Sequence, residues 1–170
     1  FNATEGVDAF RRSEVQVYAD VVQRIAALAE SKFGVTSRLH LTAPTFFSRI
    51  SGDKPPRTAH DEYWHPHVDL EQYGSFVIPS LLYLTDAGAE FEGGQFEFVP
   101  PGTTHESGAR TPARYVVTPS RGKLVLFTSG SEHPHRVTRV TSGTRLALTI
   151  AFTCDESAAV VDFLGRALEG

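Results

Sequence analysis

Residues 63–69 read Tyr-Trp-His-Pro-His-Val-Asp, which places two imidazoles and a carboxylate within one short stretch. Alternate residues of a β-strand point to the same face. A strand here would therefore direct His67 and Asp69 toward one centre, and His65 and His67 equally. A second stretch far along the chain, residues 135–145, contributes another histidine and an arginine. We predict that the chain folds around the meeting of these two stretches.

His67, Asp69 and His135 are candidate ligands for a metal ion that reacts with oxygen. Three protein ligands on one side of a metal leave the opposite side open for substrate and oxygen, and two histidines with one carboxylate suit ferrous iron. We predict that His67, Asp69 and His135 hold an iron ion and are the catalytic centre. His65 and His133 lie two residues before these histidines and are the alternatives. The adjacent aspartate favours His67, and the spacing to the arginine favours His135.

The stretch 145–154 carries a second candidate site. Its small and polar side chains take one face and its large apolar side chains the other: Arg145, Ala147, Thr149 and Ala151 against Leu146, Leu148, Ile150 and Phe152. An arginine above small residues is poorly explained as a surface residue and suits two-point binding of a carboxylate. A hairpin after His135 would bring Arg145 alongside the metal ligands. We predict that Arg145 binds an acidic cosubstrate and that the Tyr83 hydroxyl donates to the same carboxylate. The alternatives are a salt bridge to an acidic side chain and a core tyrosine bonded to backbone.

Length and composition predict one globular domain over residues 1–170. Of the 170 residues, 41% are hydrophobic and 21% are charged, which is ordinary for such a domain. The net charge of −4 provides no basic surface for nucleic acid. No apolar run approaches the roughly 20 residues that span a bilayer, so we expect no membrane segment in this chain. Cys154 is the only cysteine, which excludes an internal disulfide, and its apolar neighbours predict a buried thiol.

The pattern of apolar residues predicts a β-rich core between two helices. A first helix is expected at about 8–33, with Gly34 as a natural stop. Its predicted apolar stripe recurs at spacings of three and four and consists of Val15, Tyr18, Val22, Ile25 and Leu28. Short strand-like runs follow, separated by Gly, Pro and Ser clusters, at about 37–50, 63–69, 76–85, 94–99, 114–118, 123–128, 134–140 and 145–154. A second helix is expected at about 156–168. Many short strands with turn signals argue for a sandwich or jelly roll over about 37–154. The polar loop 100–113 is a candidate lid or substrate-contacting loop.

These motifs together resemble the iron- and 2-oxoglutarate-dependent dioxygenases, and most of all the prolyl-hydroxylase-like branch. The resemblance rests on His67-x-Asp69, the Glu92-Gly93-Gly94 turn before Phe96, and His135-x-Val137 leading to Gly143-x-Arg145. It covers about residues 63–154. Within the branch, residues 80–84, 127–132 and 149–154 resemble the group of 2-oxoglutarate and iron-dependent oxygenase domain-containing protein 3.

The resemblance implies a double-stranded β-helix, a distorted jelly roll with helices on one side. It implies that His67, Asp69 and His135 bind iron and that Arg145 and Tyr83 bind the distal carboxylate of 2-oxoglutarate. The implied cofactors are Fe(II), 2-oxoglutarate and O2, with ascorbate as a further candidate. The implied reaction is hydroxylation of a peptide or protein side chain, of the prolyl type, with release of succinate and CO2.

One departure and two rival interpretations accompany the resemblance. Many prolyl hydroxylases carry a tyrosine three residues before the first ligand histidine, where this chain has Trp64, and this weakens the case for prolyl specificity. A cupin-type metalloenzyme would use His65, His67, Glu71 and His135. A non-catalytic jelly roll that binds a peptide or glycan is the other rival. The formal glycosylation acceptor at Asn2 fits a lumenal protein of the endoplasmic reticulum or Golgi, or a membrane-anchored parent protein.

Overall fold

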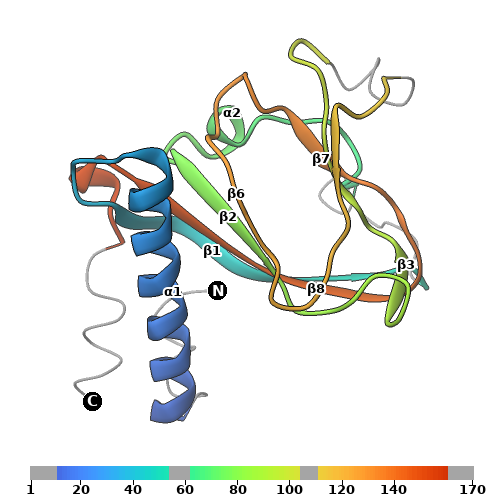
Figure 1. Ribbon diagram of the computed structural model, residues 1–170, viewed down its shortest axis with the longest axis horizontal. Coiled ribbons are helices and arrows are strands. Elements are labelled where there is room, and N and C mark those ends of the chain that lie inside the picture. The colour runs from blue at the N-terminus through green and yellow to red at the C-terminus, as the bar shows by residue number, and fades with distance from the viewer. Residues whose placement is uncertain (1–10, 54–61, 104–110, 161–170) are drawn as a thin grey trace.

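The computed structural model describes residues 11–53, 62–103 and 111–160, and these form two facing β-sheets with a long helix outside (Figure 1). In chain order the elements are α1 (Arg12–Phe33), β1 (His40–Ser51), α2 (Asp69–Tyr73), β2 (Ile78–Tyr83), β3 (Phe91–Gly93), β4 (Phe96–Phe98), β5 (Tyr115–Val117), β6 (Leu124–Leu126), β7 (His135–Val137), β8 (Val140–Thr153) and the 3-10 turn η3 (Glu156–Ala158). This mainly β architecture confirms the predicted double-stranded β-helix.

Helix α1 covers the outer face of the larger sheet, on the side away from β7 (Figure 1). Its apolar stripe is buried at five positions, Val15, Ala19, Val22, Ile25 and Ala29. The predicted stripe was nearly right, although Leu28 is 40% exposed and Ala29 is fully buried beside it. The helix ends at Phe33 because Gly34 adopts the left-handed conformation, with φ 63°. The predicted start at residue 8 lies outside the described residues.

The strands form a larger and a smaller sheet. The larger sheet has the order β1-β8-β2-β6, with β3 also paired to β8, and the smaller sheet has the order β5-β4-β7. An isolated bridge between His67 and His135 extends the smaller sheet beyond β7. Strands β7 and β8 lie in different sheets, so the hairpin expected after His135 is wrong. The chain instead crosses from one sheet to the other between Val137 and Val140.

Strand β8 divides its side chains between two cores, as its alternation predicted. Leu148, Ile150 and Phe152 pack against the buried face of α1. Ala147 faces the other way, into the space between the sheets, where it joins a cluster of larger side chains that consists of Leu81, Tyr83, Phe96 and Phe127. The small residues of this face therefore line the interior of the β-helix, and Arg145 lies on the same face two residues earlier.

The strand expected over 63–69 is wrong. The backbone turns before it can extend, because the amide of His65 donates to the carbonyl of Glu62. Within 63–69 only His67 forms a β-bridge, with His135, and Asp69 is already the first residue of α2. Strand alternation therefore does not explain how His67 and Asp69 meet.

Two predictions at the end of the chain are also corrected. The helix expected over 156–168 shortens to η3 at its start, because Ala159 is extended and bridges to Thr42 of β1. The remainder, residues 161–168, lies outside the described residues. Cys154 is exposed rather than buried, because β8 and the core end with Thr153. Most of the candidate lid, residues 104–110, and the acceptor at Asn2 also lie outside the described residues.

Among the helices of the described residues, none combines the length and the apolar character that crossing a membrane requires.

Candidate metal and cosubstrate site

Backbone pairing brings His67 and His135 face to face. The amide of His67 donates to the carbonyl of His135 at 2.9 Å, and the amide of His135 donates back at 3.0 Å. Residues paired in this way across antiparallel strands carry side chains on the same face. Their imidazole centroids are 4.3 Å apart. Two candidate ligands separated by 68 positions in the chain are thus fixed by reciprocal hydrogen bonds.

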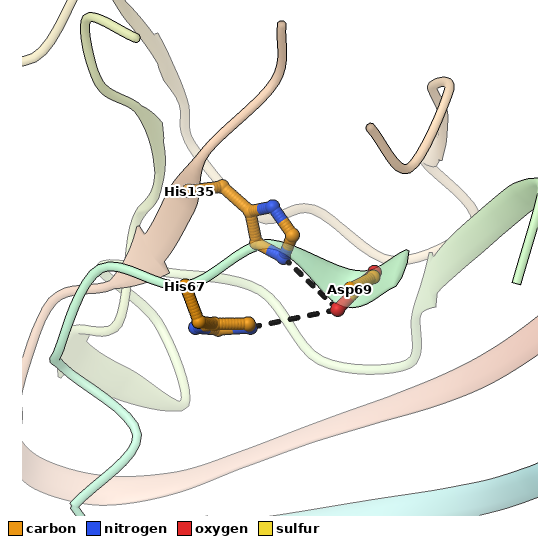
Figure 2. Close-up of side chains that lie close together, drawn as sticks. All are labelled: His67, Asp69 and His135. Carbon is orange, nitrogen blue, oxygen red and sulfur yellow. Dashed lines mark ion pairs between the residues drawn. The ribbon is translucent and has the colours of Figure 1, made fainter. Parts of the chain in front are cut away.

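Asp69 completes the cluster from the first turn of α2 (Figure 2). One of its oxygens, Oδ1, lies 3.6 Å from Nε2 of His67 and 3.5 Å from Nε2 of His135. The three side chains offer one ligand atom each, all within 4.8 Å of one another, and they form the only such group of three or more among the described residues. Asp69 is 6% exposed and His135 is 3% exposed, so two of the three ligand positions are buried.

The hydrogen bonds of the two histidines determine which nitrogen is available. Nδ1 of His67 lies 3.1 Å from the carbonyl of His65, and Nδ1 of His135 lies 3.0 Å from the carbonyl of His133. A carbonyl only accepts, so both Nδ1 atoms carry the proton and a neutral ring then presents a lone pair at Nε2. Both lone pairs face the Asp69 carboxylate. Three electron-rich atoms directed at one point suit a metal cation between them.

Burial favours the neutral form of the His67 imidazole. Burial of the His67 imidazole lowers its pKa, and the neighbouring His135 lowers it further, so His67 favours the neutral form that a metal requires. Phe96 stacks on the His135 ring with centroids 4.9 Å apart, and Phe127 meets it edge-on at 4.8 Å. The two aromatic rings limit the orientations of His135 and contribute to its burial.

Arg145 is a buried cation that lacks a charged partner among the described residues. Its side chain is 2% exposed, and its Nε donates to the carbonyl of Gly94 at 3.1 Å. Burial lowers the pKa of the guanidinium, which the nearby Tyr83 partly offsets. Within the described part of the chain, Nη2 of Arg145 has no hydrogen-bond acceptor. An unpaired buried charge is costly, so this geometry calls for an anion, and no acidic side chain among the described residues forms a salt bridge with Arg145.

Tyr83 lies beside Arg145 with a free hydroxyl. The ring centroid is 5.3 Å from the guanidinium carbon, and the side chain is fully buried. Among the residues that the structure describes, the hydroxyl has no hydrogen-bond partner, contrary to the alternative of a core tyrosine bonded to backbone. Burial raises the pKa of Tyr83 to about 12, so it remains a donor at neutral pH. Two orphan donors side by side fit the carboxylate of an acidic cosubstrate such as 2-oxoglutarate.

One cavity of about 1350 Å³ joins the two halves of the site. It is lined by His67, Asp69 and His135 and also by Arg145. Strand β1, an edge strand of the larger sheet, contributes one wall of this cavity, and Phe46 is part of that wall. The volume exceeds what a small dicarboxylate occupies, so the cavity has room for a second, larger ligand.

The alternative ligands have other environments. Nε2 of His65 is 2.8 Å from Oε2 of Glu62. Nδ1 of His133 lies 3.0 Å from the hydroxyl of Thr128. Glu71 is exposed on α2. Neither alternative histidine, nor Glu71, belongs to the group of ligand atoms described above, so the geometry does not assemble the cupin set.

Two residues that shape the site, Gly94 and Tyr63, were not among the predicted site residues. Gly94 has φ +65°, and a Cβ there would lie 2.9 Å from Cδ of Arg145, so only glycine leaves room for the guanidinium. The hydroxyl of Tyr63 accepts from the amide of Val140 at 3.0 Å and ties the first stretch to the start of β8. The double glycine was visible in the sequence, but its contact with Arg145 was not.

Comparisons with known proteins agree with this geometry. The 2OG-Fe(II) oxygenase superfamily matches residues 56–153. The mouse protein named 2-oxoglutarate and iron-dependent oxygenase domain-containing protein 3 is 46% identical over 90% of this chain and 45% of its own length. Chicken prolyl 3-hydroxylase 1 is 28% identical over 82% of this chain and 20% of its own length. The chain therefore spans about half the length, or less, of the curated relatives it matches.

Solved structures support the fold. A 2OG-Fe(II) oxygenase family oxidoreductase from Burkholderia pseudomallei superposes with a TM-score of 0.54 and 16% sequence identity, over 76% of this chain and 50% of that one. At this level of identity the likeness concerns the fold alone, and it agrees with the double-stranded β-helix.

Proposed function

The chain belongs to the 2OG-Fe(II) oxygenase superfamily, and we propose that it forms one oxygenase domain that hydroxylates a peptide or protein side chain of the prolyl type. The cofactors of this family are Fe(II), 2-oxoglutarate and O2, and the products would include succinate and CO2. The observation that carries the proposal is the pairing of a two-histidine, one-carboxylate cluster with an orphan buried guanidinium in one cavity. The peptide substrate rests on the similarity to prolyl 3-hydroxylases.

In this proposal His67, Asp69 and His135 hold the iron from one side. The two Nδ1–H···O=C hydrogen bonds orient both Nε2 atoms, and the Asp69 carboxylate compensates the charge of the cation. Bound iron supplies the activation of O2 and the oxidation of a C–H bond. The protein contributes ligand geometry and a partly dry cavity, since Phe96 and Phe127 shield His135.

Arg145 and Tyr83 would orient 2-oxoglutarate by its distal carboxylate. The guanidinium is already held by the Gly94 carbonyl and the hydroxyl remains protonated, so little reorganisation accompanies binding. A carboxylate would satisfy both orphan donors and neutralise the buried charge. The remaining end of the cosubstrate would then point along the cavity toward the metal ligands.

The test is anaerobic addition of Fe(II) and then 2-oxoglutarate to the protein, with the visible absorption band of the chelated complex as the signal. We expect the band in the parent protein, its loss in His135→Ala, and a band in Arg145→Ala that requires much more 2-oxoglutarate. Arg24→Ala removes an exposed charge from α1 and serves as the matched control. A folded, metal-loaded parent protein that shows no band would refute the proposed function.

A further inference from the structure

The cavity mouth carries a guanidinium that the proposed chemistry does not use. Arg139 lines the cavity, and its guanidinium carbon lies 3.8 Å from the centroid of the Trp64 ring. This contact is shorter than most cation–π contacts, which extend to about 6 Å. The arginine is therefore stacked on the one tryptophan of the chain, at the position where the sequence departs from many prolyl hydroxylases.

Hydrogen bonds connect the two segments that carry this pair at the edge of the metal site. The amide of Val137 donates to the carbonyl of Tyr63 at 3.4 Å, and the Tyr63 hydroxyl accepts from Val140 at 3.0 Å. The carbonyl of Arg139 accepts from the amide of Gly94 at 3.3 Å. Trp64 is thus tied to the segment that carries Arg139. A guanidinium ordered in this way loses less entropy when it binds an anion.

The charges around the cavity differ in how far they are satisfied. Among the charged side chains that line it, Glu62 pairs with His65 at 2.8 Å, and Asp53 contacts the Ser51 hydroxyl. The guanidinium of Arg139, in contrast, is exposed and contacts no acidic side chain among residues 11–53, 62–103 and 111–160. Arg139 therefore contributes a positive charge without an acidic partner among these residues to the cavity mouth, although the whole chain carries a net charge of −4.

We propose that Arg139, stacked on Trp64, is a specificity-determining residue that binds an acidic side chain of the peptide substrate. The inference rests on the proposed function and names the substrate class more closely. Trp64 precedes His67 by three residues, which span at most about 10 Å. The acidic residue would therefore lie within about three residues of the side chain that is oxidised.

The probes are acetylated and amidated heptapeptides of glycine that contain one proline next to either Glu or Gln, on either side. Dissociation constants are measured by calorimetry with the Fe(II)- and 2-oxoglutarate-loaded protein under argon, and Trp64 fluorescence locates the binding. We expect the better Glu peptide to bind about 5- to 10-fold more tightly than its Gln counterpart at low salt, since a charge-assisted pair replaces a neutral one. Salt at 0.5 M should largely remove the preference, which would identify it as electrostatic.

Three variants make the test specific. Arg139→Gln should abolish the preference for Glu, and Arg139→Lys should retain part of it because a lysine keeps the charge without the planar stack. Arg24→Gln removes a charge from α1 and should leave the preference unchanged. No preference in the parent protein, no binding of either peptide, or a preference that survives Arg139→Gln would each overturn the inference.

The same samples separate this inference from the proposed function. All variants should form the Fe(II)–2-oxoglutarate absorption band at the parent's cosubstrate concentration. A band in Arg139→Gln that needs more 2-oxoglutarate would assign the arginine to the cosubstrate and overturn the inference alone. An absent band in the parent protein would refute the proposed function, while the same peptide titrations with the unloaded protein would still decide whether Arg139 binds acidic peptides.

Discussion

Substitution of Gly94 by alanine tests how the cosubstrate arginine is held. A Cβ at this position would lie 2.9 Å from Cδ of Arg145, 2.9 Å from Cε2 of Phe91 and 3.0 Å from Cγ2 of Val140. Three contacts from different residues leave no free direction, so a neighbour must move. The longest and most flexible of the three is Arg145, whose Nε is bonded to the carbonyl of Gly94 itself. We therefore expect Gly94→Ala to displace the guanidinium.

The expected loss concerns 2-oxoglutarate and not iron. A hydrogen bond to a charged group contributes about 1.5–3 kcal/mol, so a displaced Arg145 should raise the 2-oxoglutarate concentration for half-maximal binding about 10- to 100-fold. Fe(II) affinity should remain at the parent value, because the three candidate ligands lie on other elements. The assay is the anaerobic absorption titration, first with metal and then with 2-oxoglutarate.

Gly122→Ala provides the matched control. Gly122 has φ +79°, close to the +65° of Gly94, but a Cβ there meets nothing within 4 Å. Both variants should lose about 1–2 kcal/mol of stability from the left-handed backbone conformation, and only Gly94→Ala should lose cosubstrate affinity. Equal affinity for 2-oxoglutarate in both variants and the parent protein would refute the reasoning.

Three further predictions concern Tyr83, His67 and the pair formed by Glu97 and Arg136. Tyr83→Phe removes one donor, so the 2-oxoglutarate requirement should rise about 3- to 10-fold with unchanged Fe(II) affinity; an unchanged requirement in the absorption titration would contradict this role. Burial lowers the pKa of His67 in the folded protein, so as the pH falls the unfolded chain binds a proton at this residue before the folded protein does. The metal-free protein should therefore lose stability as pH falls below about 6.5. Urea midpoints at pH 7.5 and 5.5 measure this, and His67→Gln should reduce the difference; an equal difference in both proteins would argue against it. Nε of Arg136 donates to Glu97 at 2.7 Å across β4 and β7, and each side chain is 15% exposed. Glu97→Gln should therefore lower the free energy of unfolding in urea by about 1–3 kcal/mol. A urea midpoint equal to that of the parent protein would show that the pair is not stabilising.

Much of the fold could be predicted from local pattern. The spacing of apolar residues predicted α1, and the left-handed Gly34 ends it where expected. Alternation over 145–154 predicted that Leu148 and Ala147 would face different cores, as they do. The early end of the C-terminal helix could not be predicted from local pattern, because Ala159 forms an extended bridge with Thr42, which belongs to a strand far away in the sequence.

The residue types that form the candidate site could be predicted from the sequence, but their arrangement in space could not. The residue types around His67 and His135 limit the metal and the reaction class, and Arg145 above small residues indicates an acidic ligand. The route by which Asp69 meets the histidines was predicted wrongly, since it belongs to a helix rather than a strand. Periodicity describes one segment at a time, and the ligand cluster depends on two segments that pair through backbone hydrogen bonds.

The sequence by itself determined the β-rich fold class, the outer helix and the set of side chains available for metal and carboxylate binding, because each depends on local spacing and residue type. Only the tertiary structure decided that one Asp69 oxygen faces both Nε2 atoms, that Gly94 makes room for Arg145, and that Arg139 stacks on Trp64. Apart from the contact between His67 and Asp69, these contacts join residues distant in the chain. They arise from sheet pairing and close packing that no local pattern specifies.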